Sequence, residues 1–293
     1  MDIPTPWPAE APQGPLRLEQ PATLLRLDGP DSLRFLHGQS SQDLQLAPPG
    51  AWRRSCCLSP TARVTALVEV LADAEGAWLV ISAGDGAAVR AQLDRVLFPA
   101  DQVTLGATEP VRLIEPLPAP LNAEAPGDPG DAHWSSLDGD PEKGFQLGHG
   151  WIVLRGASAQ PAEVASWPAA TSHDAEQWRI RQGRPGMPGE LNGETNPFEL
   201  GLASRVSLTK GCYVGQETLA RLVTYDGIKQ QLRRWHWQGT GAEADALATT
   251  LQAGQALVTP EGERAGRITS LLRLDATPTA ATECESETSS ESE

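Results

Sequence analysis

One run of eight residues could do chemistry that few other parts of the chain could. It joins a cation, a thiol, a phenol, a carboxylate and two glycines: Lys210, Gly211, Cys212, Tyr213, Val214, Gly215, Gln216 and Glu217. Glycine on both sides of Cys-Tyr-Val allows sharp turns, and the pattern predicts that Gly215 opens a helix. Cys212 would then lie just before a helix N-terminus, two residues from Lys210, and both features stabilise a thiolate. The alternative is a small buried cysteine at a turn that the glycines shape.

The remaining cysteines form no recognisable disulfide framework or metal site. Cys56 and Cys57 are adjacent and Cys284 lies in an acidic stretch, a pattern typical of free thiols in a reducing, cytoplasmic compartment. The sequence has no CxxC or HExxH pattern, and its five histidines are not at ligand spacing on one helix. We expect no dedicated metal site, and we expect Cys56 and Cys57 to be buried in a strand.

The composition indicates a globular, acidic protein. Of 293 residues, 40% are hydrophobic and 21% charged, and the formal net charge is −15. Such a charge argues against general binding to nucleic acid or to anionic membranes. No run of about 18 apolar residues predicts a membrane span. We expect residues 1–15 to be a disordered lead-in without a signal peptide, and residues 276–293 to be a solvated acidic tail.

The first hundred residues predict an α+β arrangement. Residues 22–27 read as a strand, and Asp31 is placed to cap a helix that runs towards residue 42. Residues 63–71 and 77–82 read as strands. Residues 89–97 then carry an amphipathic helical pattern that Pro99 stops.

The rest of the chain alternates irregular and ordered segments. Residues 116–140 read as a long loop, 151–154 as a strand and 174–182 as a helix, and residues 198–203 look helical before the run that begins at Lys210. Three further segments read as short strands that would form a small C-terminal β-barrel, namely residues 232–238, 255–260 and 264–273.

The run from Lys210 to Glu217 closely resembles the signature of the YgfZ family, Lys-Gly-Cys-Tyr followed by Gly-Gln-Glu. Three other segments agree with that family in order and spacing, and together they extend the resemblance over residues 35–221. They are residues 35–39 with Asp43, residues 179–183 with Pro185, and Asn196-Pro197 with Glu199, Gly201 and Leu202.

The resemblance implies a fold and a function. Family members bind tetrahydrofolate, or a one-carbon derivative of it, and support iron-sulfur proteins, so the implied partners are iron-sulfur client or assembly proteins. The related glycine-cleavage aminomethyltransferase implies two α+β lobes and a C-terminal β-barrel around a central folate cavity. For this chain we expect the lobes at residues 16–110 and 111–229 and the barrel at 230–275.

The resemblance also implies roles for single residues. Cys212 and Lys210 would carry any chemistry, and the folate contacts would come from Gln39, Asp43, Arg179, Tyr213, Gly215, Gln216 and Glu217. Alternatives stay open: Arg179 could form a structural ion pair, Asp43 could cap local backbone, and Lys210 could be exposed at a turn. We interpret Gln216 and Glu217 as supports for the helix start, and the lone His37 as structural.

Two departures bear on activity. Related aminomethyltransferases carry an acidic residue where this chain has residues 62–67, and no carboxylate occurs there. Residues 143–151 also lack the Gly-Tyr-Thr-Gly-Glu type of string. We therefore expect an accessory folate protein rather than a glycine-cleavage enzyme, with folate-dependent one-carbon transfer as the alternative. A cysteine hydrolase is a third hypothesis, which would need His173 or His236 near the thiol.

Overall fold

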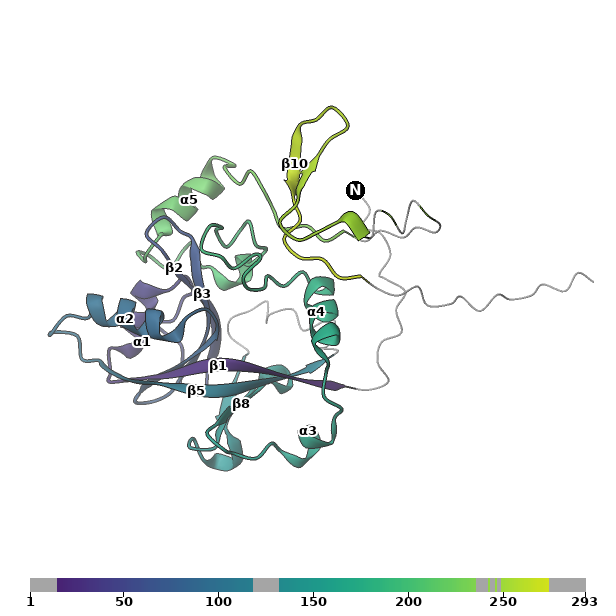
Figure 1. Ribbon diagram of the computed structural model, residues 1–293. Coiled ribbons are helices and arrows are strands. Elements are labelled where there is room, and N and C mark those ends of the chain that lie inside the picture. Colours follow the sequence, from purple (N-terminus) through teal and green to yellow (C-terminus); the bar gives the residue numbers. More distant parts are fainter. Residues whose placement is uncertain (1–14, 118–131, 236–241, 243–245, 247–248, 274–293) are drawn as a thin grey trace, which may run out of the picture.

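The computed structural model describes residues 15–117, 132–235, 242, 246 and 249–273 (Figure 1). The strands are β1 Leu16–Asp28, β2 Trp52–Leu58, β3 Val64–Ala72, β4 Gly76–Ala83, β5 Thr104–Leu117, β6 Trp134–Ser136, β7 Gly144–Leu147, β8 Ile152–Arg155, β9 Ala256–Val258 and β10 Arg264–Arg267. The helices α1 to α5 are α1 Ser32–Gln39, α2 Gly86–Val96, α3 Ala162–Ser166, α4 Ser172–Arg181 and α5 Gln216–Thr224. Short 3₁₀ turns occupy Leu137–Gly139, Gly148–Gly150 and Ala203–Arg205.

Eight of the strands form one antiparallel sheet in the order β2-β3-β4-β1-β5-β8-β7-β6. The sheet curls until its two ends meet beside β2. There the Trp52 amide donates to the Ala132 carbonyl at 2.7 Å, and the Trp134 amide donates to the Gly50 carbonyl at 3.0 Å. The two edges of the sheet are therefore partly satisfied by each other.

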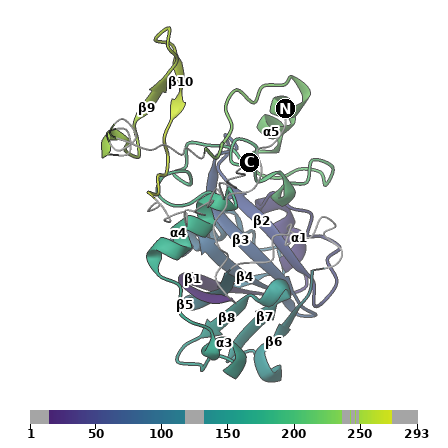
Figure 2. The same ribbon diagram turned by 90° about the vertical axis from the view of Figure 1, so that its right-hand side faces the viewer.

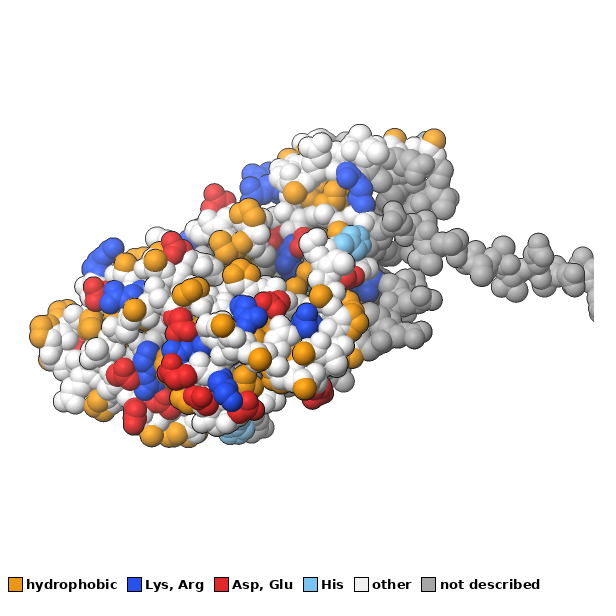
Figure 3. Space-filling view, turned by 60° about the horizontal axis from the view of Figure 1, so that its bottom comes forward, with side chains coloured by type: hydrophobic (Ala, Val, Ile, Leu, Met, Phe, Trp, Pro, Cys, Tyr) orange, Lys and Arg blue, Asp and Glu red, His pale blue; other side chains and the backbone are white. Residues whose placement is uncertain are grey.

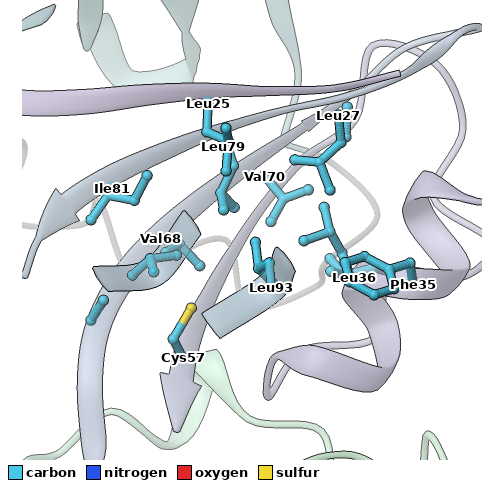
Figure 4. Packing of buried hydrophobic residues seen from close by; sticks show 14 of the residues in the cluster. Leu25, Leu27, Phe35, Leu36, Cys57, Val68, Val70, Leu79, Ile81 and Leu93 are labelled. Atoms are coloured by element: carbon cyan, nitrogen blue, oxygen red, sulfur yellow. The ribbon is translucent and has the colours of Figure 1, made fainter. Parts of the chain in front are cut away.

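Helices α1 and α2 cover one face of the sheet. Alternate residues of the strands point towards them, as Leu25 and Leu27 of β1 and Val68 and Val70 of β3 do (Figure 4). These residues pack with Leu36 of α1 and with Leu93 of α2 in one buried cluster. The period of two in the strands thus separates the two faces of the sheet.

The opposite face carries two further clusters. One packs Trp52 of β2 against residues of β5 to β8, including Phe145. The other packs Cys56 and Leu58 of β2 under Tyr213 and Leu219. Figures 1 and 2 place α4 on this side of the sheet, opposite α1 and α2.

Most expected elements are confirmed in place. The strands expected at 22–27, 63–71 and 77–82 correspond to β1, β3 and β4, and that at 151–154 to β8. The helices expected at 89–97 and 174–182 correspond to α2 and α4. Cys56 and Cys57 are buried in β2, as expected.

Two local expectations differ from the structure. Residues 198–203 form turns that lead into the 3₁₀ turn Ala203–Arg205 rather than a helix. Asp31 occupies the cap position of α1 but makes no capping hydrogen bond. Its carboxylate instead accepts from the backbone amide of Gln102 at 3.1 Å and from Arg34 at 3.2 Å, so a tertiary partner and a side chain of α1 replace the cap.

The C-terminal barrel is not confirmed. In the described part of residues 230–275, β9 and β10 form a two-stranded sheet, which stands apart from the large sheet in both views (Figures 1 and 2). Residues 232–235 carry no strand, and residues 236–238 lie outside the described residues. The terminal segments at 1–14 and 274–293, which include nearly all of the expected disordered ends, also lie outside them. The expected lobe boundary at residues 110 and 111 falls inside β5.

No helix in the described part of the chain is both long and apolar enough to cross a membrane. On the face drawn in Figure 3, acidic and basic side chains are interspersed.

Candidate functional site

The segment that carries Cys212 runs from the 3₁₀ turn Ala203–Arg205 to α5, beside the C-terminal end of α1. Backbone hydrogen bonds attach it there at two points. The Ser207 amide donates to the Ser41 carbonyl at 2.9 Å, and the Val214 amide donates to the Gly38 carbonyl at 3.3 Å. The run is therefore anchored to the end of α1 across more than 160 residues of sequence.

Lys210 is the strongest of these anchors. Its Nζ donates to the carbonyl of His37, to that of Ser40 at 2.7 Å and to that of Gln42 at 2.8 Å. The same ammonium lies 4.5 Å from the centre of the Tyr213 ring. All three of its N–H donors are thus used on carbonyls at the C-terminal end of α1 and just after it, where the helix dipole favours a positive charge.

Burial has a cost for Lys210. Desolvation lowers the pKa of its ammonium from 10.5 to about 7, and nearby Asp43 partly opposes that shift. The structure gives Lys210 a positioning role, and it is half-buried rather than exposed at a turn. A role for Lys210 in chemistry stays a prediction.

His37 completes the junction from the side of α1. Its Nε2 lies 2.9 Å from the Lys210 carbonyl, and its Nδ1 lies 3.3 Å and 3.2 Å from the amides of Leu44 and Gln45. Both ring nitrogens thus lie within hydrogen-bond distance of backbone groups. His37 therefore holds backbone together, in agreement with the structural interpretation.

Gln39 and Asp43 flank this junction. Gln39 is the last residue of α1 and is half-buried. Asp43 is exposed, with Oδ1 3.2 Å from His37 Nδ1. The structure thus brings both predicted folate contacts next to Lys210 and its loop, and their contact with folate stays a prediction.

Cys212 is exposed at the tip of the anchored segment, whereas Cys56 and Cys57 are buried. Burial raises the pKa of Cys56 to about 11 and that of Cys57 to about 12. Of these three thiols, Cys212 is the one that solvent and reagents reach. The alternative of a small buried Cys212 is therefore wrong, and the reactivity of its thiol stays a prediction.

Tyr213 turns inward where Cys212 turns outward. Its ring is buried against Leu58 and Ala62. Desolvation, and then the neighbouring Cys56, raise the pKa of Tyr213 to about 12. Its hydroxyl has no hydrogen-bond partner among the described residues. Tyr213 thus fixes the exposed cysteine to the sheet.

Gly215 and Gly211 give the segment its path, with φ of 83° and 95°. Gly215 is also the N-cap of α5. A Cβ on Gly215 would lie 3.0 Å from Ala62 Cα and from the Ser59 carbonyl oxygen, so it must be glycine for conformation and for space.

Helix α5 begins directly after Gly215, as expected, without a side-chain cap. Glu217 is exposed and pairs with Arg221 at 2.6 Å. Gln216 is half-buried, and its backbone N–H donates to the Tyr213 carbonyl at 3.1 Å. The carboxylate of Glu217 therefore pairs along the outer face of α5, and the expected side-chain support of the helix start is not found there.

Arg179 belongs to a different network. It pairs in two places with Glu176, at 2.7 and 2.5 Å, and its other donors reach the Arg184 carbonyl, Glu190 and Ser270. These contacts use all five of its N–H groups on protein acceptors. Arg179 therefore forms the structural ion pair that was the alternative to a folate contact. Its contact with folate stays a prediction that would require exchanging one of these partners.

Sequence reasoning missed a buried polar network on the face of β2 and β3. Glu69 of β3 is fully buried and accepts from Arg205 at 2.9 Å and from Trp52 Nε1 at 3.0 Å. Arg205 also donates to the carbonyls of Ser55 and Val68. This network ties the segment ahead of Lys210 to the sheet. The one available signal was a lone charged residue in the mostly apolar strand Val64–Ala72.

Comparison with known proteins supports the fold. No protein-family model matches the chain. It is 29% identical over 273 residues to a chloroplastic protein of Arabidopsis thaliana that bears the name "Putative transferase", and the match covers 84% of this chain and 59% of that protein. The chain thus spans less than two thirds of that relative's length.

A solved structure gives the architecture. The glycine cleavage system aminomethyltransferase T from Bartonella henselae matches with a TM-score of 0.59 at 19% identity, over 88% of this chain and 74% of that one. The chain therefore has the fold of that aminomethyltransferase. At this identity the likeness concerns the fold alone.

Proposed function

We propose that this protein binds tetrahydrofolate, or a one-carbon derivative of it, and acts as an accessory factor for iron-sulfur proteins. The observation that carries the proposal is the exposed Cys212 on a segment that Lys210, His37 and Tyr213 hold in place. A thiol that is both accessible and positioned suits contact with a client protein. The aminomethyltransferase fold supports the folate part of the proposal.

The described residues also fit a polar ligand. Buried polar atoms without a hydrogen-bond partner among the described residues include Arg54 Nε and Tyr213 Oη, both on side chains that lie on the α4 side of the sheet. Leaving such groups unpaired costs about 1–3 kcal/mol each. Folate offers amide and carboxylate acceptors for groups of this kind, so the chemistry of these side chains is compatible with it.

A second candidate function is folate-dependent transfer of an aminomethyl or one-carbon group. The name of the Arabidopsis relative favours it. Glu69 does not supply a free base for it, because Arg205, Trp52 and Ser82 already use its oxygens. An assay that follows methylene-tetrahydrofolate formation separates a transferase, which turns over, from an accessory protein, which does not.

The test of the leading proposal is complementation of a strain that lacks its own accessory factor, scored by the activity of an iron-sulfur enzyme. We expect Cys212→Ser to abolish the rescue at equal expression, because serine nearly preserves volume but removes thiolate chemistry. Cys284→Ser is the control and should rescue like the wild type. Full rescue by the Cys212 variant would remove the thiol from the proposal.

A further inference from the structure

Arg54 is a cation on β2 that the network described above does not use. It lies directly opposite Glu69 in the β2–β3 ladder. Its side chain is 20% exposed, and its guanidinium lies over the Trp151 ring at 5.3 Å. The position is therefore enclosed but reachable.

The Nε of Arg54 lacks a hydrogen bond in the described part of the chain. This nitrogen is buried, and it stays 3.6 Å from Glu69 Oε2. That distance is too long for a hydrogen bond. Glu69 cannot turn towards Arg54 without giving up the bonds from Trp52 and Arg205. The carboxylate opposite Arg54 is thus already used.

The charges around Arg54 do not balance. Arg205 pairs with Glu69 and Arg184 pairs with Glu115, so Arg54 is the third arginine beside two carboxylates. Desolvation first, and then Arg205, lower the pKa of Arg54 to about 10. An acidic chain of net charge −15 therefore keeps one excess positive charge inside this cluster.

We propose that Arg54 binds a carboxylate group of the ligand. A guanidinium presents parallel N–H groups that match a carboxylate, and a single negative charge balances the single unmatched arginine. A phosphate dianion would bring a second charge next to Glu69 and Glu115. The proposal rests on the proposed function in that folate carries such carboxylates, and it names the residue that receives one.

Arg155 is a matched control for Arg54. It too lies over a tryptophan, with its guanidinium 5.1 Å from the Trp78 ring, and its side chain is 13% exposed. Unlike Arg54 it has full partners, since it pairs with Glu109 at 2.7 Å and Glu142 at 3.0 Å. Methionine at each position keeps an unbranched side chain and removes the charge.

The experiment measures binding and melting temperature for the full chain, Arg54→Met and Arg155→Met. The probes are tetrahydrofolate, 6-methyltetrahydropterin, which lacks carboxylates, p-aminobenzoylglutamate and inorganic phosphate. We expect Arg54→Met to weaken tetrahydrofolate at least about tenfold, as a lost charge-assisted bond does, and to leave 6-methyltetrahydropterin unchanged. We expect Arg155→Met to lower the melting temperature without ligand and to keep tetrahydrofolate affinity.

The outcomes separate this inference from the proposed function. If tetrahydrofolate binds the wild type and Arg54→Met with equal affinity, the role of Arg54 is overturned and folate binding stays intact. A second outcome is that p-aminobenzoylglutamate stabilises the wild type but not Arg54→Met, while neither tetrahydrofolate nor 6-methyltetrahydropterin stabilises the chain. That result supports the role of Arg54 and refutes folate binding. If Arg54→Met lowers the melting temperature as much as Arg155→Met does, Arg54 has a structural role and the proposal is overturned. Stronger Arg54-dependent stabilisation by phosphate than by any carboxylate, or no effect of any carboxylate, also overturns it.

Discussion

Cys212 differs from Cys56 and Cys57 in what surrounds each sulfur. The first is exposed at a loop tip, and the other two are enclosed in β2 between the sheet's covering layers. A thiol reacts as its thiolate and only where a reagent can reach it. The burial of Cys56 and Cys57 and their raised pKa values therefore both make these two thiols less reactive than an exposed one.

We predict that a native Cys284→Ser chain reacts with a thiol reagent at one site. The expected site is Cys212, because burial raises the pKa of Cys56 to about 11 and of Cys57 to about 12. Spectrophotometric titration with an aromatic disulfide reagent measures this, first in buffer and then in denaturant. Rapid native labelling that persists in Cys212→Ser/Cys284→Ser would contradict the prediction.

Lys210 makes stability depend on pH in a defined direction. Its pKa is about 7 in the folded chain, against 10.5 for an ordinary lysine. Below pH 7 the lysine is protonated in both states and the full cost of burying its charge applies. Between about pH 7 and 10.5 the unfolded chain binds more protons, so the free energy of unfolding gains up to about 1.4 kcal/mol per pH unit from this group.

Lys210→Met should remove that gain. Denaturant unfolding of both chains between pH 6.5 and 9.5 measures it, and the wild type should become more stable relative to the variant as the pH rises. Lys143→Met is the control, because Lys143 is exposed and pairs with Asp138 on the surface. A wild-type advantage that shrinks with rising pH would refute the assigned burial of Lys210.

At the scale of elements, the start of α5 depends on glycine for two separable reasons. Gly215 and Gly211 both have positive φ, but only Gly215 faces backbone at 3.0 Å, while nothing lies within 4 Å of a Cβ on Gly211. Comparing alanine substitutions at Gly211 and Gly215 therefore separates the cost of a positive φ from the cost of a steric clash.

We predict that Gly215→Ala destabilises the chain more than Gly211→Ala does. The positive φ alone costs about 1 kcal/mol, and the contact with Ala62 and Ser59 adds to it at residue 215. Equilibrium unfolding in urea measures both variants. Equal losses would mean that α5 can move away from the β2–β3 turn at little cost.

The junction between the sheet and the segment before Lys210 rests on Glu69 and Arg205. Their side chains are 0% and 5% exposed. We predict that Glu69→Ala lowers the free energy of unfolding by about 3–5 kcal/mol, because it leaves a buried arginine without its partner. The double variant Glu69→Leu/Arg205→Met should recover much of that loss in the same urea experiment. A loss in the double variant equal to the sum of the losses in the two single variants would contradict the pairing.

The apolar period predicted α2 and Gly215 predicted α5, and local capping contacts agree with the starts of α2 and α4. Asp85 caps α2 by accepting from two amides, and Thr171 with Asp174 forms a capping box at α4. These contacts lie within four residues, so the sequence itself displays them. Gly215 marks the start of α5 in the same way.

Strands β2 and β5 were less visible because tertiary contacts determine them. Arg54 in β2 is a charged position whose burial depends on Glu69 of β3 and on Trp151. Pro110 and Pro116 in β5 predict a loop or an edge. Both prolines lie outside the four-residue ladder that β5 forms with β8, at residues 111–114, so neither removes a bond from that ladder.

The candidate site was predicted in part. The run at 210–217 and its neighbours Gln39 and Asp43 converge, but the anchoring of Lys210 on three carbonyls could not be read from sequence, since those carbonyls lie about 170 residues away. The cluster of Glu69, Arg205 and Arg54 was missed for the same reason: spacing along the chain does not show which charges the curled sheet brings together.

At the scale of the whole molecule, one curled sheet supports both the exposed thiol and the arginine cluster. Helices α1 and α2 pack on one face and α4 lies on the other (Figure 1), and the thiol-bearing segment packs through Tyr213 against Cys56 and Leu58 of β2. The fold is that of aminomethyltransferase T, while the match to the chloroplastic relative covers 59% of that protein. Binding to folate must therefore be measured on this chain.

Calorimetric titration of the full chain with tetrahydrofolate tests the central claim most directly. The account predicts saturable binding by the wild type, nearly equal binding by Cys212→Ser, and a melting temperature that rises with ligand concentration, because a ligand that binds only the folded state must stabilise it. No heat and no stabilisation at saturating tetrahydrofolate would contradict it.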